Sequence, residues 1–249
     1  MSGHSKWASI KHKKALVDAK RGQAFTKVIR EITVAAKTGG GDPAMNPRLR
    51  TAIQSAKDSN MPADNIDRAI KKGTGELEGV VYEEMTYEGF GPAGTAVLVA
   101  CLTDNKNRSA SEIRSVFNKN GGNMGGGGTV AWMFERKGFI VIPKTATTED
   151  QLMEIALGAG AEDMTSTDQM FEVTTVPHDL WAVREAIEKA GIKIESANLT
   201  MIPKNLVAVN ADTGRTVVKL IQALEEHDDV QNVYSNADIP DEVMKELSA

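Results

Sequence analysis

Apolar residues recur at helical spacing through the first part of the chain. In residues 20–37 they fall at i, i+3, i+4, i+7 and i+11 and share one helix face: Phe25, Val28, Ile29, Ile32 and Ala36. The run Gly39–Pro43 predicts the end of this helix, because glycine permits a left-handed cap and proline cannot continue a helix. Shorter patterns of the same kind begin at Pro47 and after Pro62. The pattern therefore predicts a small bundle of three helices.

Beyond a glycine-rich linker that ends at Gly79, short β-type runs alternate with helical patterns. The first expected elements are strands at 82–87 and 95–102, a helix at 109–118 and a strand at 129–134. Residues 138–203 then follow the order strand, helix, strand, strand, helix, strand, which is typical of a ferredoxin-like antiparallel sheet with both helices on one face. A strand at 206–209, a helix at 213–225 and a strand at 230–235 follow. We expect the C-terminal strand and the helix before it to complete the sheet begun before residue 138.

These patterns predict an α+β multidomain fold: an N-terminal three-helix bundle followed by two α/β sandwich domains, one of them ferredoxin-like. The expected domains are a basic helical domain with its N-terminal arm and linker (1–79), a discontinuous α+β domain (80–137 with 204–237), a ferredoxin-like domain inserted into it (138–203), and an acidic C-terminal helix (238–249).

Charge divides the chain in the same way. The first 72 residues hold 15 Lys and Arg and 6 Asp and Glu, a net charge of +9. The whole chain holds 29 and 34, so the remaining 177 residues hold 14 and 28, a net charge of −14. A cationic segment attracts polyanions and releases their condensed counterions. The asymmetry favours contact with nucleic acid over the simpler interpretation of a solvated basic face.

The candidate contacts follow from this charge pattern. The nucleic-acid-binding candidates are Lys6, Trp7, Lys11, His12, Lys13, Lys14, Lys20, Arg21, Lys27, Arg30, Lys71 and Lys72. Trp7 either stacks on a base or packs on the bundle. Possible secondary contacts, which we expect to lie near one another, are Asn105, Asn107, Arg108, Gly121, Gly122 and Asn123.

Other residue types exclude several function classes. The single cysteine, Cys101, rules out an intrachain disulfide and a Cys-based zinc site. The four histidines lack metal-ligand spacing, and no serine lies in a nucleophile elbow. We therefore expect no catalytic residues, no metal, no cofactor and no small-molecule substrate, and so no enzyme. Without an apolar leader or a membrane-length apolar run, we expect a cytoplasmic protein with no membrane partner.

The run Gly121–Gly128 invites comparison with a phosphate-binding loop. Such loops follow a strand and open a helix, whereas this run is expected to follow a helix and precede a strand. We therefore interpret it as a flexible loop with left-handed turns, and a backbone contact to a nucleic-acid phosphate is the alternative.

Several short motifs resemble the YebC family, which includes the mitochondrial translational activator of cytochrome oxidase subunit one. The most specific are Gly3-His4-Ser5-Lys6-Trp7, Gly39-Gly40-Gly41-Asp42-Pro43, Asn46-Pro47-Arg48-Leu49-Arg50 and Arg68-Ala69-Ile70-Lys71-Lys72-Gly73. The resemblance continues through Thr103-Asp104-Asn105, Gly121-Gly122-Asn123 and Phe134-Glu135-Arg136-Lys137-Gly138, although Gly125–Gly128 departs from it.

The resemblance implies a helical domain followed by two α/β domains, and a non-enzymatic, cytoplasmic regulatory protein. Bacterial members are described as probable DNA-binding transcriptional regulators, and this is the function we expect. The alternative is a ribosome-associated translation factor that contacts ribosomal RNA, since some relatives act on translation. A protein–protein adaptor, in which the basic segment binds an acidic protein, is a further alternative.

Overall fold

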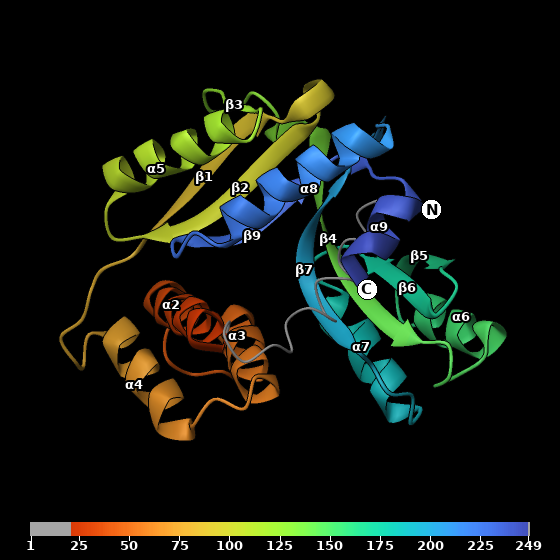
Figure 1. Ribbon diagram of the computed structural model, residues 1–249. Helices are drawn as coiled ribbons and strands as arrows, with labels where there is room; N and C mark the ends of the chain where they lie inside the picture. The colour runs from red at the N-terminus through yellow and green to blue at the C-terminus, as the bar shows by residue number, and fades with distance from the viewer. Residues whose placement is uncertain (1–20, 249) are drawn as a thin grey trace. The chain divides into compact units, whose positions relative to one another are not determined.

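The computed structural model describes residues 21–248, and these form two compact units (Figure 1). One unit consists of residues 132–206. The other consists of residues 21–131 and 207–248. Within this larger unit, we call residues 21–79 the head, and residues 80–131 with 207–248 the body. None of the described helices is both long and apolar enough to cross a bilayer.

The head is the predicted three-helix bundle. Its helices are α2 (Arg21–Gly39), α3 (Pro47–Asp58) and α4 (Ala63–Thr74), and α2 packs against both of the others. The predicted apolar faces meet in one core, in which Ile32, Leu49 and Ala69 are almost fully buried. A Cβ atom at Gly73 would lie 2.4 Å from the carbonyl oxygen of Thr33, so the close approach of α4 to α2 requires glycine there.

The body is built on a four-stranded antiparallel sheet in the order β3-β1-β2-β9. Its strands are β1 (Glu83–Phe90), β2 (Ala96–Thr103), β3 (Asn123–Met124) and β9 (Val230–Ser235), and a short 3₁₀ turn, η2 (Pro92–Gly94), joins the first two. Helices α5 (Lys106–Lys119) and α8 (Ala211–Glu225) cover one face of the sheet (Figure 1). As predicted, the C-terminal strand completes this sheet, because β9 pairs with β2.

The end of the chain adds two smaller elements to the body. Strands β8 (Val207–Ala208) and β10 (Ala237–Asp238) form a parallel pair. Helix α9 (Asp241–Ser248) contributes Val243 and Met244 to the core between the sheet and α8.

The unit at 132–206 has the predicted ferredoxin-like topology. Strands β4 (Phe134–Pro143), β5 (Ala161–Ser166), β6 (Met170–Thr175) and β7 (Ser196–Pro203) form an antiparallel sheet in the order β5-β6-β4-β7. Helices α6 (Glu149–Gly158) and α7 (Leu180–Lys189) pack on one face over Ile140, Ile142 and Val173. A Cβ atom at Gly138 would lie 2.2 Å from the Thr175 hydroxyl and 2.9 Å from the Leu180 Cβ, so β4 requires glycine at this point.

The predicted strand at 129–134 is wrong. Residues 131–133 form a 3₁₀ turn, η3 (Ala131–Met133), and the strand that follows, β4, runs from Phe134 and pairs with β6 and β7. The strand predicted from Phe139 is therefore the second half of a longer one, and the inserted domain was predicted to begin at residue 138, inside that strand. The fourth strand of the body sheet is β3 instead.

Candidate nucleic-acid interface

The structure separates the basic residues of the head into two groups. Some donate hydrogen bonds to protein acceptors, and others are exposed at the surface. The first group contains Lys27 and Arg30 on α2 and Arg48 on α3. The second contains Lys37, Lys57, Arg68, Lys71 and Lys72. A cation of the first group must give up an existing partner before it can meet a phosphate.

Arg30 binds the body through several acceptors. Its Nη1 donates to the Asp229 carboxylate at 2.7 Å, to the Asp228 carbonyl at 2.7 Å and to the Leu102 carbonyl at 3.3 Å. Its guanidinium carbon lies 5.3 Å from the centre of the Tyr82 ring, within the range of a cation–π contact. The Arg30 side chain is only 13% exposed. Arg30, a nucleic-acid-binding candidate from the sequence, therefore contacts another part of the chain.

Lys27 and Arg48 make related contacts. The Lys27 Nζ donates to the Glu225 carbonyl at the end of α8 over 2.7 Å, which places the cation at the negative end of that helix. The Arg48 Nε donates to Glu31 at 2.7 Å, and its Nη1 pairs with Glu84 of β1. Burial alone would lower the pKa of Arg48, but these two carboxylates outweigh it and raise the pKa. All three cations therefore pair with acceptors of the chain itself.

Asp229 is the buried carboxylate that pairs with Arg30. It is 1% exposed, and its Oδ2 accepts hydrogen bonds from the Ser109 hydroxyl at 2.6 Å, from Arg108 Nη2 at 2.7 Å and from the Thr103 hydroxyl at 3.0 Å. Burial alone would raise the pKa of Asp229, but the hydrogen bonds from these groups and Arg30 outweigh it and lower the pKa to about 2. Asp229 is therefore ionised at neutral pH.

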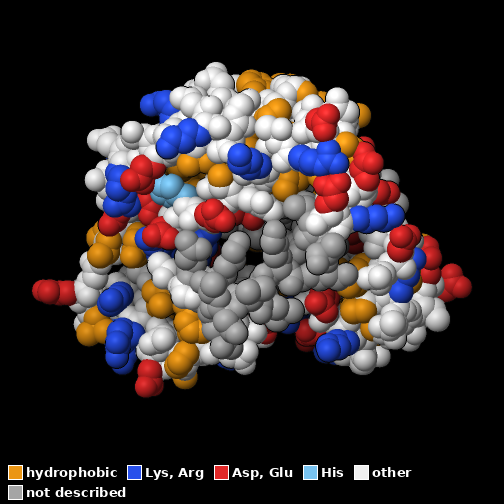
Figure 2. All heavy atoms as spheres, viewed as in Figure 1, with side chains coloured by type: hydrophobic (Ala, Val, Ile, Leu, Met, Phe, Trp, Pro, Cys, Tyr) orange, Lys and Arg blue, Asp and Glu red, His pale blue; other side chains and the backbone are white. Residues whose placement is uncertain are grey.

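The clearest exposed group lies on α4. Arg68, Lys71 and Lys72 fall at i, i+3 and i+4, so they share a helix face, and that face points away from the buried Ile66 and Ala69. The basic residues of the last turn also interact favourably with the helix C-terminus, which is a purely structural reason for two of them. Figure 2 shows Lys and Arg side chains at the surface, with Asp and Glu side chains among them.

The remaining primary candidates have different outcomes. Lys6, Trp7, Lys11, His12, Lys13, Lys14 and Lys20 lie outside the described residues. Arg21 is the first residue of α2. Of the other candidates, Lys71 and Lys72 are exposed, whereas Lys27 and Arg30 are used in contacts with the body.

The possible secondary contacts do not lie together as expected. Asn105 caps the start of α5, where its side chain accepts from the Arg108 N–H, while Gly121–Asn123 follow the end of the same helix. A helix of 14 residues separates the two groups. Asn107 is exposed, but the Arg108 guanidinium pairs with Asp104 and Asp229. Gly121 has φ +75° in the turn before β3. The expected single cluster is therefore wrong.

A buried carboxylate holds the glycine-rich loop. Glu88 is 6% exposed, and its two oxygens accept from the backbone N–H groups of Gly128 at 2.7 Å, Val130 at 2.6 Å and Ala131 at 2.8 Å. Burial would raise the pKa of Glu88, but these backbone donors outweigh it and lower the pKa. The three N–H groups already bind an anion, so they are not available to a phosphate.

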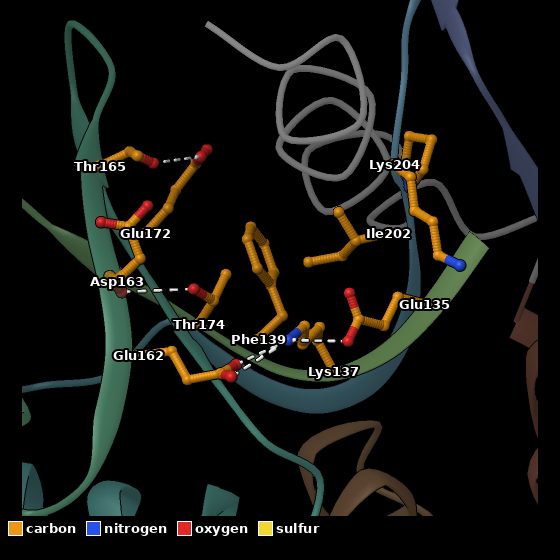
Figure 3. A pocket seen from close by; sticks show the side chains of 11 residues that line it. Glu135, Lys137, Phe139, Glu162, Asp163, Thr165, Glu172, Thr174, Ile202 and Lys204 are labelled. Carbon is orange, nitrogen blue, oxygen red and sulfur yellow. Dashed lines mark hydrogen bonds and ion pairs between the residues drawn. The ribbon is translucent and has the colours of Figure 1, made fainter. Parts of the chain in front are cut away.

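A hollow of about 350 Å³ lies on the face of the second sheet opposite α6 and α7. Figure 3 shows Lys137 there between Glu135 and Glu162, at 3.1 Å and 2.9 Å. Hydrogen bonds from Lys137 to Glu162 and then Glu135 raise the pKa of Lys137. Asp163 and Glu172 also line the hollow, so acidic groups outnumber basic ones, which disfavours phosphate. Among residues 21–248, no group of three or more His, Cys, Asp or Glu is placed to hold a metal.

Comparison with known proteins matches nearly the whole chain. Residues 5–76 match the model of the TACO1/YebC protein N-terminal domain, and residues 82–237 match that of the TACO1/YebC second and third domain. A probable transcriptional regulatory protein of Desulfatibacillum aliphaticivorans is 60% identical over 246 residues, which cover 99% of this chain and 100% of that one. One of Persephonella marina is 56% identical over 250 residues, covering all of both chains.

A solved structure gives the same result for the fold. The crystal structure of a conserved hypothetical protein, Aq1575, from Aquifex aeolicus is similar with a TM-score of 0.86 and 52% sequence identity, and the match covers 94% of this chain and 97% of that one.

Proposed function

Because this chain belongs to the TACO1/YebC family, we propose that it is a non-enzymatic regulatory protein of the cytoplasm whose head binds nucleic acid through phosphate contacts. Its bacterial relatives are named as probable transcriptional regulatory proteins, which makes duplex DNA the first partner to test. Ribosomal RNA is the alternative partner.

One observation carries this proposal: the exposed cations of the head remain after the intramolecular contacts have been accounted for. Arg68, Lys71 and Lys72 present three positive charges on one face of α4. Phosphate contacts of this kind position a protein on nucleic acid but carry no sequence information, so they support binding rather than the recognition of a particular site.

The test is a salt titration of binding to duplex DNA and to purified large ribosomal subunits, carried out in parallel. For wild type on DNA, log Kobs should fall linearly with log salt concentration. Replacing Arg68, Lys71 and Lys72 with glutamine should reduce the slope by up to about 0.9 for each phosphate that is no longer neutralised. Affinity should fall for every DNA sequence alike.

The matched control removes the same charge from the body. Arg114, Lys106 and Lys119 all lie on α5 and are exposed, and their replacement by glutamine should leave the slope unchanged. If both triple variants weaken binding equally, only the net charge matters and the head is not the binding surface. Binding to ribosomal subunits that persists at a salt concentration where DNA dissociates would favour the translation alternative.

A further inference from the structure

Polar side chains connect the head to the body. Among residues 21–248, the apolar core of the head and that of the body are separate clusters with no shared residue. Cationic side chains of the head instead reach acceptors of the body: Lys27 and Arg30 from α2, and Arg48 from α3. The Arg30 side chain is 13% exposed, against 36% for the Arg48 side chain.

We propose that Asp229, with the neighbouring carbonyl groups of Glu225 and Asp228, is an intramolecular latch that occupies Lys27 and Arg30, and that a nucleic acid which competes for these cations releases the head. The release step rests on the proposed function, whereas the latch itself does not.

The chemistry of the acceptors allows a phosphate to compete with them for Lys27 and Arg30. Guanidinium groups bind carboxylates and phosphates in similar geometry, so Asp229 occupies the place that a phosphate oxygen would take. Three acceptors used by Lys27 and Arg30 are neutral carbonyls, at Leu102, Glu225 and Asp228, and water can replace the cations there. Since the described residues of the head and body form separate apolar cores, a competing anion can separate the two parts.

The body should also stay folded when the head is released. When Arg30 leaves, Asp229 keeps its hydrogen bonds from Thr103, Ser109 and Arg108, all of which belong to the body. A buried carboxylate that lost its last partner would strongly oppose opening, but this one would not be left unpaired. The Arg30 contact is therefore reversible without disruption of the body.

The latch is tested by a distance measurement between spin labels. Lys57 on α3 and Lys119 on α5 are exposed and can be replaced by cysteine for labelling. The native Cys101 is 3% exposed, and burial raises its pKa to about 12, so it should remain unlabelled. Double electron–electron resonance on the labelled protein, otherwise wild type, should give one narrow distance distribution.

The decisive variant is Arg30→Met, which keeps the apolar stem of the side chain but cannot pair with Asp229. It should broaden the distribution, whereas Lys37→Met, an exposed position on the same helix, should not. Duplex DNA at saturation should broaden the wild-type distribution as well. A narrow distribution for Arg30→Met overturns the latch, and a wild-type distribution that DNA leaves narrow overturns the release.

An affinity measurement separates the latch from a general effect of charge. Asp229→Asn should bind duplex DNA about five-fold more tightly, the factor expected for loss of one competing ion pair of modest strength. Asp228→Asn removes the same charge from the next residue but leaves the Asp229 carboxylate in place, and it should change affinity less. An equal increase in DNA affinity in both variants would show that Asp229 does not compete with DNA for Arg30. If wild type does not bind DNA or ribosomal subunits at all, the proposed function and the release fail, but the Arg30→Met distances still decide the latch.

Discussion

Replacing Glu88 with glutamine should weaken the attachment of the glycine-rich loop to the body sheet. The Glu88 carboxylate accepts three backbone hydrogen bonds, with Oε1 facing Gly128 and Oε2 facing Val130 and Ala131. A glutamine at this position has one oxygen and one amino group. The oxygen can keep either Gly128 or the other two donors, but the amino group would then face an N–H group with nothing to accept its hydrogen.

The magnitude follows from these bonds. A hydrogen bond to a charged group contributes about 1.5–3 kcal/mol, and a buried donor left unsatisfied costs about 1–3 kcal/mol. A glutamine whose oxygen keeps the hydrogen bonds from Val130 and Ala131 loses the bond from Gly128. It also weakens the two remaining bonds from the strength of a charged acceptor to that of a neutral one. The lost bond accounts for about 1.5–3 kcal/mol and each weakened bond for about 1 kcal/mol. The free energy of unfolding of the unit that contains the body should therefore fall by about 3–5 kcal/mol, since Glu88 is 6% exposed and water cannot replace the missing acceptor.

The assay combines urea unfolding with hydrogen exchange of single amides. The amide protons of Gly128, Val130 and Ala131 should exchange faster in Glu88→Gln than in wild type. The control is Glu83→Gln on the same strand, where the carboxylate is 62% exposed and lies 4.0 Å from the Lys106 amine, so its loss should cost less than about 0.5 kcal/mol. A cost that small for Glu88→Gln, together with unchanged exchange of the three amides, would show that something else holds the loop.

Three other buried or crowded positions can be tested in the same way. Because the pKa of Asp229 is lowered from 3.8 to about 2, its contribution of about 2 kcal/mol should be present above pH 4 and lost as the pH falls to 2, and Asp229→Asn should remove that slope from urea midpoints measured against pH. Gly138→Ala should destabilise the unit at 132–206 by about 2–3 kcal/mol in urea unfolding, whereas Gly158→Ala, where a Cβ would meet nothing within 4 Å, should not. Cys101 should react with a thiol reagent only after unfolding, and reaction in the native protein at mildly alkaline pH would contradict its burial.

Regular periodicity allowed most of the fold to be predicted. The apolar stripe through Ile29, Ile32 and Ala36 lies on the packed side of α2, as its helical spacing requires. The alternation of strands and helices in the ferredoxin-like unit was equally informative, because each element there buries one side against the same core. Such elements are determined by their own residues, and a long-range partner only confirms them.

The predictions from the sequence fail where a distant residue determines the local structure. Residues 129–134 are nearly all apolar and resemble a buried strand, but Glu88, more than 40 residues earlier, captures the N–H groups of Val130 and Ala131 and ends any strand there. The available signal was an acidic residue directly after the strand expected at 82–87. An acidic side chain that is buried beside apolar neighbours must find donors, and the glycine-rich loop supplies them.

The same reasoning explains why charge alone did not predict which cations of the head are exposed. A segment with a net charge of +9 attracts polyanions, but it also attracts the acidic parts of its own chain, which has a net charge of −14 outside that segment. Because the two are covalently joined, the acidic parts are present at a high effective concentration. Lys27 and Arg30 meet Asp229 and its neighbours for that reason, while Arg68, Lys71 and Lys72 remain on the surface. For the proposed release, a partner must therefore carry a higher charge density than the body. Nucleic acid meets that condition, with one negative charge per about 1.7 Å of duplex, whereas an acidic protein surface resembling the body does not.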